Sequence, residues 1–250
     1  MKHKSIVLHL LVLCLVFLTT TAKASSDLVK DMVHFDQVYI PVLALTSEEK
    51  VEPARRAMAM LEPEWNMFKT KYYSLSGNDT HWQHDFDKVD AYIQSGKAII
   101  KRGTKLKEAH EEFEHIRVVF MGLRARNNIE YFIDHLTRFH EPMERIVLAV
   151  KGKTEATLTD KDLGVVKNTI AEARRLWQIT SDANLDAVLY GFNKEKTQIL
   201  HALIEKESLA LKHLQKAIKR GNKKEIIQTG LAIKPNFARL FKAFGQFPAN

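Results

Sequence analysis

The sequence predicts an all-α protein: an antiparallel helical bundle of four to five helices, followed by a second, smaller helical domain. Three observations predict this fold. Apolar residues recur at helical rather than strand spacing along almost the whole chain. Polar pairs with the spacing of a capping box indicate helix starts. Glycines follow basic helix ends, where a left-handed cap is favourable.

These signals predict eight helices and one short helical piece. The expected helices cover about residues 27–45, 47–72, 80–102, 104–125, 128–150, 160–182, 193–220 and 223–243, with the short piece near 184–190. The capping-box pairs are Thr46 with Glu49, Thr80 with Gln83, and Asn222 with Glu225. The expected C-terminal caps are Gly103, Gly152 and Gly221.

The clearest pattern lies in the helix expected over residues 104–125. Its apolar residues follow steps of three and four, which is typical of the seam of a bundle helix: Leu106, Ala109, Phe113, Ile116, Phe120 and Leu123. The helix expected over 128–150 has a matching set: Ile129, Phe132, Leu136, Phe139, Met143 and Ile146. Short connections between long amphipathic helices predict antiparallel neighbours, so we expect these two helices to form a hairpin.

The first 24 residues are expected to be a cleaved signal peptide. Lys2 and Lys4 supply a positive start, residues 6–18 form an apolar run, and a small-residue cleavage site ends at Ala24. The apolar run is shorter than the about 20 residues that a membrane span needs. We therefore expect a periplasmic or secreted protein with no transmembrane span after cleavage near Ala24.

Cys14 is the single cysteine and lies in this leader. The mature chain is therefore expected to have no disulfide and no thiolate metal ligand, and c-type haem attachment is excluded. Loss of the leader removes three lysines and lowers the formal charge from +8 to +5.

Two halves of opposite charge follow the leader. Residues 25–150 contain 17 Lys and Arg against 20 Asp and Glu, whereas residues 151–250 contain 18 against 10. The polar stretch 151–157 separates them, which predicts an acidic N-terminal bundle over 25–150 and a basic C-terminal domain over 151–250. The basic half has no aromatic-interleaved basic face or nucleic-acid motif, so nucleic acid is not an expected partner.

One repeated motif is a candidate metal site. His110 with Glu114, and His140 with Glu144, are spaced so that each pair shares a helix face. The expected turn lies near Arg126, 16 residues after His110 and 14 before His140, so the two imidazoles should lie at one level of the hairpin. Two imidazoles and two carboxylates suit zinc, copper or iron. The imidazoles alone could be axial ligands of a b-type haem.

Structural alternatives stay open for these histidines. A His and a Glu one helical turn apart commonly form a stabilising pair worth about 0.2–0.5 kcal/mol. His81 and His84 are secondary metal candidates because of their i, i+3 spacing, but a place at an exposed helix start favours surface histidines. A di-iron enzyme would need a second Glu-x-x-His motif, which this chain lacks.

Sequence motifs of catalysis are weak. The chain has no glycine-rich phosphate loop, no serine elbow and no His-Glu-x-x-His motif, which favours a non-enzymatic protein. We therefore expect an exported helical-bundle binding protein that carries a divalent transition metal or a b-type haem for carriage, sensing or electron transfer. The alternative is a ligand-free interaction module of the cell envelope, with an unknown envelope protein as its partner.

Overall fold

The structure is a computed structural model that describes residues 27–75 and 79–249. The described residues are all-helical and contain no strand, so the predicted all-α class is confirmed, whereas the layout of a bundle followed by a smaller domain stays a prediction. The expected signal peptide lies outside them. In the described part of the chain, no helix combines the length and apolar character that crossing a membrane would require.

Eight helices follow one another along the described residues. The first covers residues 27–47. The others are α2 (Val51–Tyr72), α3 (Trp82–Arg102), α4 (Leu106–Arg126), α5 (Phe132–Val150), α6 (Asp160–Asp182), α7 (Lys194–Arg220) and α8 (Lys223–Lys242). The short helix expected near 184–190 is not formed, because residues 187–191 make turns instead.

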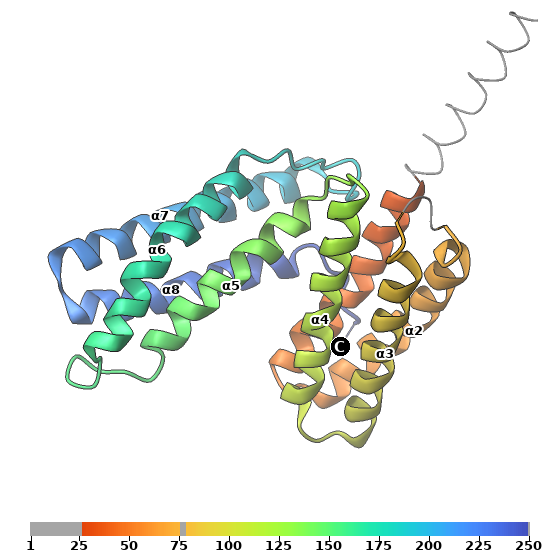
Figure 1. The fold of residues 1–250 in the computed structure, drawn as a ribbon, viewed down its shortest axis with the longest axis horizontal. Coiled ribbons are helices and arrows are strands. Elements are labelled where there is room, and N and C mark those ends of the chain that lie inside the picture. The colour runs from red at the N-terminus through yellow and green to blue at the C-terminus, as the bar shows by residue number, and fades with distance from the viewer. Residues whose placement is uncertain (1–26, 76–78, 250) are drawn as a thin grey trace, which may run out of the picture.

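The helices form two groups of four (Figure 1). The first helix, α2, α3 and α4 make one group, and α5 to α8 make the other. Packing follows this grouping, because α4 lies chiefly against α3, while α5 lies against α6 and α8. The expected hairpin of α4 and α5 is therefore wrong: the two helices diverge from the turn at residues 127–131. The division of the chain at residue 150 stays a prediction.

An aromatic cluster forms the core of the first group. Phe35 of the first helix lies with its ring centroid 5.8 Å from that of Trp65 in α2 and 5.1 Å from that of Phe120 in α4. Phe68 of α2 stacks on Phe86 of α3 at 5.7 Å. Such pairs contribute about 0.5–1.5 kcal/mol each beyond the area they bury. The cluster therefore joins all four helices of this group.

The second group has its own core around Phe139 of α5. Its ring centroid lies 4.6 Å from that of Trp177 in α6 and 5.8 Å from that of Phe237 in α8. The indole nitrogen of Trp177 donates to the carbonyl of Ile204 in α7 at 3.2 Å, so this buried polar group is satisfied. Phe139 thus packs α5 against α6 and α8, and Trp177 links α6 to α7.

The predicted helix ends are partly confirmed. Asn222 caps α8 by accepting a hydrogen bond from the Glu225 amide, and Gly103 and Gly221 take the left-handed conformation at the ends of α3 and α7. The cap at Thr46 is wrong, because this residue is buried inside the first helix. Its hydroxyl donates to the carbonyl of Val42 at 2.8 Å, as serines and threonines inside helices often do.

The start of α3 also differs from the prediction. No side chain caps this helix at Thr80; instead, Asp79 Oδ1 accepts a hydrogen bond from the His81 amide at 3.0 Å, just before α3 begins. A capping box that the sequence analysis missed begins α6, where Thr159 and Asp162 exchange hydrogen bonds. Aspartate in place of glutamate at its third position hid this signal.

Candidate binding site at the junction of the helix groups

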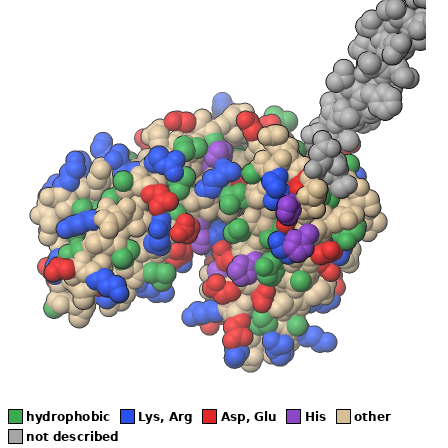
Figure 2. All heavy atoms as spheres, viewed as in Figure 1, with side chains coloured by type: hydrophobic (Ala, Val, Ile, Leu, Met, Phe, Trp, Pro, Cys, Tyr) green, Lys and Arg blue, Asp and Glu red, His purple; other side chains and the backbone are tan. Residues whose placement is uncertain are grey.

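A cavity of about 240 Å³, which we call the junction cavity, lies where the end of the first helix meets α4, α5 and α8. Histidine, acidic and basic side chains border the hollow between the two helix groups (Figure 2). All four residues of the predicted metal site line this cavity. The lining residues are Leu43, Ala44, Ser47, Glu48, His110, Glu114, Arg117, His140, Met143, Glu144, Lys234, Phe237, Ala238, Phe241 and Lys242.

His110 is held by the backbone of the first helix. Its Nδ1 lies 3.0 Å from the carbonyl oxygen of Leu43. Because a carbonyl only accepts, Nδ1 is the donor, and Nε2 is the ring nitrogen left for another partner. That nitrogen lies 3.4 Å from Glu114 Oε1. The hydrogen bond to the Leu43 carbonyl thus fixes the orientation of the His110 ring. Histidines that bind metals are oriented in the same way, by a hydrogen bond at the nitrogen that does not bind the metal.

His140 has partners at both ring nitrogens. Arg117 donates to Nδ1, and Nε2 lies 3.5 Å from Glu144 Oε1. Burial lowers the pKa of His140, and the nearby Arg117 charge lowers it further. The hydrogen bond to Glu144 opposes this shift but does not cancel it. His140 is therefore a neutral ring at pH 7, with its hydrogen on Nε2 toward Glu144.

Glu114 lies between the two imidazoles. Its Oε1 is the atom near His110, and its Oε2 is 3.9 Å from His140 Nδ1 and also contacts Arg117. The two histidines are thus bridged by one carboxylate, although α4 and α5 form no hairpin. The predicted residues are brought together by side-chain contacts between α4 and α5 and not by a helical hairpin.

The remaining charges of the cavity are paired as well. Burial alone would raise the pKa of Glu144, but hydrogen bonds from His140 and Lys234 hold it at about 2. Lys242 of α8 pairs with Glu48 at the end of the first helix, so it links the two helix groups. Three carboxylates are matched by three permanent cations, which leaves the cavity close to neutral while His140 is uncharged.

Arg117 is the central cation of the site. Its side chain is only 5% exposed, and its guanidinium lies 5.7 Å from the centroid of the Phe241 ring. The guanidinium contacts Glu114 and His140, but its Nε–H has no hydrogen-bond partner among the described residues. A buried donor without an acceptor is costly, by about 1–3 kcal/mol. Arg117, which lines the junction cavity, therefore keeps an unused donor next to the Phe241 ring.

The four predicted ligands do not form an open metal site. Within residues 27–75 and 79–249, no three His, Cys, Asp or Glu side chains are placed to hold one metal ion. Arg117 gives the physical reason, because it contacts both Glu114 and His140 where a bridging cation would lie. A metal role for these residues stays a prediction, and it requires Arg117 to move.

A b-type haem fits the junction cavity poorly. Its volume is below the roughly 300–1,000 Å³ of pockets that enclose drug-sized ligands. His140 also has no nitrogen free for an axial bond in this arrangement. Haem would need both a larger space and a rearranged His140.

The secondary candidates lie elsewhere. His81 and His84 are exposed and do not line the junction cavity. His81 Nδ1 lies 3.3 Å from the hydroxyl of Thr80 and 3.9 Å from Asp79 Oδ1. These contacts are those of a surface histidine at a helix start.

Sequence reasoning missed the basic and aromatic half of the site. Arg117 had a local signal, because it follows Glu114 by three residues and lies next to Ile116 at the edge of the apolar seam. Lys234 and Phe237 had none, since they come from α8 and reach the site only through the packing of α8 on α5.

Comparison of the chain with protein-family models, with curated proteins and with solved structures finds no match. The function of the chain is therefore inferred from the chemistry of the site.

Proposed function

We propose that this chain is an exported, non-enzymatic binding protein whose site is the junction cavity. The proposed ligand is a small molecule with an apolar body and a carboxylate head. Export is proposed from the leader pattern of residues 1–24, and it would deliver the protein to the periplasm or the exterior.

The free Nε–H of Arg117 carries this proposal. A guanidinium offers five donors in a fixed plane, which suits a carboxylate better than any other side chain does. Glu114 and His140 use part of this capacity, and Nε remains for a ligand oxygen. A bound carboxylate would therefore satisfy a buried donor that has no partner within residues 27–75 and 79–249.

The walls of the cavity support an apolar body on the same ligand. Met143, Phe237 and Phe241 line it together with Leu43. Covering apolar surface contributes about 25 cal/mol per Å² removed from water. The volume of about 240 Å³ limits this body to a short chain or a single ring.

A divalent transition metal is the second candidate, because one observation favours it. The Leu43 carbonyl orients the His110 ring so that Nε2 lies beside Glu114, and these two groups together could serve as metal ligands. Binding would require the metal to displace Arg117 from Glu114 and His140.

Calorimetric titrations with hexanoate and with Zn²⁺, at about pH 6 and pH 8, would distinguish these ligands. Hexanoate should bind about equally at the two pH values, because the lowered pKa of His140 keeps its ring uncharged at the lower one as well. Zinc should bind more weakly there, because its ligands must lose their protons. We expect Arg117→Lys to weaken hexanoate binding by about tenfold or more, since lysine lacks the planar fork.

Arg174→Lys is the matched control, because Arg174 lies on α6 and contacts Gln215 outside the cavity. It should bind hexanoate like the wild type. The metal candidate would be favoured if the wild type bound zinc but not hexanoate, and if His110→Ala lost the zinc binding. Failure of both probes would favour the alternative, a ligand-free interaction module of the envelope.

A further inference from the structure

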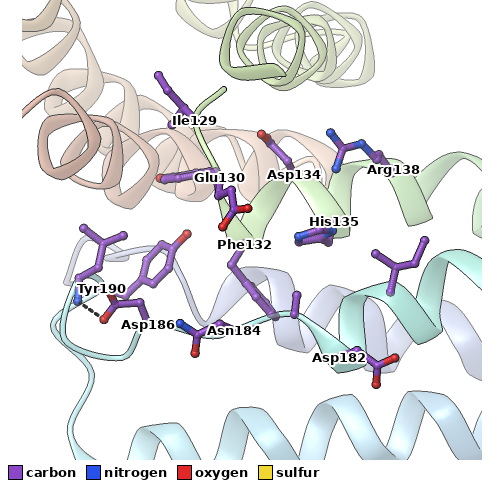
Figure 3. Close-up of a pocket in the computed structure, with 14 residues that line it drawn as sticks. Ile129, Glu130, Phe132, Asp134, His135, Arg138, Asp182, Asn184, Asp186 and Tyr190 are labelled. Atoms are coloured by element: carbon purple, nitrogen blue, oxygen red, sulfur yellow. Dashed lines mark hydrogen bonds between the residues drawn. The ribbon is translucent and has the colours of Figure 1, made fainter. Parts of the chain in front are cut away.

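A second and larger cavity lies away from the junction cavity and shares no lining residue with it. It has a volume of about 610 Å³ and lies between the start of α5, the end of α6 and the segment 183–190 (Figure 3). This volume is within the roughly 300–1,000 Å³ of small-molecule pockets. We call it the acidic cavity, after the residues described next.

Carboxylates surround the opening of the acidic cavity. Glu130 approaches from the α5 side, while Asp182 and Asp186 lie opposite on α6 and the following segment (Figure 3). All three are exposed and form no ion pair among the described residues. Asp182 accepts a hydrogen bond from Gln178, and Asp186 accepts hydrogen bonds from two backbone amides of its own segment, in each case through Oδ1. Asp134 also lines the cavity but is already paired with Arg124. Arg138 is the one Lys or Arg side chain among the lining residues, so three carboxylates without ion pairs leave the opening negative overall. A negative opening favours a cationic ligand.

The base of the cavity is aromatic and contains an unused polar group. Tyr190 is 3% exposed, and its hydroxyl has no hydrogen-bond partner among the described residues. Its phenol is directed toward Glu130 and Phe132 across the inner end of the cavity (Figure 3). The neighbouring Tyr131 differs, because its hydroxyl donates to Asp36 at 2.7 Å. Tyr190 therefore offers a buried acceptor beside the faces of aromatic rings.

These features together identify the class of ligand. The carboxylates lie on opposite sides of the opening, so a single small cation would not reach all of them, and no metal-binding group of three occurs among the described residues. A chain with several ammonium groups and methylene segments between them matches both parts of the cavity. Ammonium groups bind carboxylates and aromatic faces, and methylenes cover apolar surface.

We propose that the acidic cavity binds a linear organic polyamine, with ammonium groups on Glu130, Asp182 and Asp186 and an amine donating to the Tyr190 hydroxyl. This site is separate from the one proposed for a carboxylate. Each can therefore fail without the other.

Titration of the purified protein with spermidine at low ionic strength tests this proposal. We expect one bound spermidine per chain and an affinity that falls as salt is added, because exposed charges are screened. The single amine n-butylamine should bind about tenfold more weakly, since it can use only one carboxylate. No measurable heat with millimolar spermidine would overturn the proposal.

A double variant and its control test whether spermidine binds at these carboxylates. The double variant Glu130→Gln/Asp182→Asn should lower spermidine affinity by about tenfold at low salt. Its matched control is Glu111→Gln/Glu155→Gln, which removes the same charge from two exposed residues outside the cavity and should bind like the wild type. Equal loss in both double variants would mean general charge attraction and would overturn the assigned site.

Tyr190→Phe separates a binding role from a structural one. The hydroxyl makes no hydrogen bond within the described protein, so its removal should leave the melting temperature unchanged or higher. Spermidine affinity should nevertheless fall by about threefold or more, because one hydrogen bond to the ligand is lost. Unchanged affinity in Tyr190→Phe would contradict the proposed contact.

Discussion

Glu207 is a buried carboxyl group without a counter-ion. It lies in α7 with no exposed surface, and neither carboxylate oxygen has a hydrogen-bond partner among the described residues. Burial raises the pKa of Glu207 to about 8, and the smaller opposing effect of the neighbouring Asn236 side chain does not cancel this rise. The folded protein therefore holds Glu207 protonated at neutral pH.

This protonation predicts a pH dependence of folding. The folded pKa is above the unfolded value of about 4.3, so the unfolded chain releases the proton first as pH rises. The stability that neutral Glu207 contributes is complete below that value and is lost as pH rises through about 8. We expect Glu207→Gln to remove this loss, which can reach about 1.4 kcal/mol per pH unit.

Urea unfolding at about pH 5, 7 and 9 measures this effect. The exposed neighbour Glu205 provides the control, because Glu205→Gln removes a carboxylate from the same helix and should keep the wild-type pH slope. Identical slopes in the wild type and Glu207→Gln would contradict the protonated state of Glu207.

At the scale of elements, α3 and α4 approach each other closely at Gly96. A Cβ atom on this glycine would lie 2.5 Å from Cζ of Phe113, which is itself fully buried. We expect Gly96→Ala to lower the free energy of unfolding by about 1–3 kcal/mol, because the ring has little room to move. Thermal melts followed by circular dichroism would measure the loss.

Gly164 provides the matched control for this substitution. It lies inside α6, and a Cβ atom there would meet no other atom within 4 Å. Gly164→Ala should stabilise the protein by about 0.5–1 kcal/mol, the usual difference between the two residues inside a helix. If Gly96→Ala were equally stabilising, the contact with Phe113 would not limit how closely α3 and α4 pack.

The helices could be predicted from the sequence because helical periodicity is a local property. All six seam residues expected in α4 are buried, and the first and last of them, Leu106 and Leu123, lie within its observed bounds. The helix caps were less predictable, because a threonine side chain can either cap a helix or hydrogen-bond to a carbonyl inside it. Thr46 is buried and bonds to the Val42 carbonyl inside the first helix. Its burial depends on tertiary packing, which a short stretch of sequence does not contain.

At the scale of the whole molecule, the sequence predicted the acidic half of the junction cavity and missed its basic half. His110 and His140 were found because each has a glutamate one turn away. The hairpin that should have joined them is not formed, since α5 packs on α6 and α8 instead. The packing of α8 on α5 also brings Lys234 to the site from a distant part of the chain. This packing is therefore the reason both that the hairpin is not formed and that Lys234 could not be predicted.

The two helix groups are joined by a buried ion pair at the turn between them. Arg124 of α4 contacts both carboxylate oxygens of Asp134 in α5, with Nε 2.9 Å from Oδ2 and 3.1 Å from Oδ1. The guanidinium also lies 4.3 Å from the centroid of the Tyr131 ring, and Tyr131 donates to Asp36 of the first helix. Burial raises the pKa of Asp36 to about 6, and the Arg124 charge limits that rise. The charge of Arg124 thus stabilises two buried carboxyl groups, Asp36 and Asp134, which belong to different helix groups.

Arg124→Met should therefore cost about 3–5 kcal/mol of unfolding free energy, because it leaves Asp134 buried without its cation. Arg124→Met/Asp134→Leu should recover much of this loss, since the stranded charge is removed and Asp36 can take up a proton. Urea unfolding of both variants measures the difference, and X-ray scattering should show a larger radius of gyration only for Arg124→Met. Arg174→Met, on the surface of α6, should change neither quantity. If the double variant were no more stable than Arg124→Met, the loss would come from missing packing of the arginine side chain, and the pair would not be what holds the two groups together.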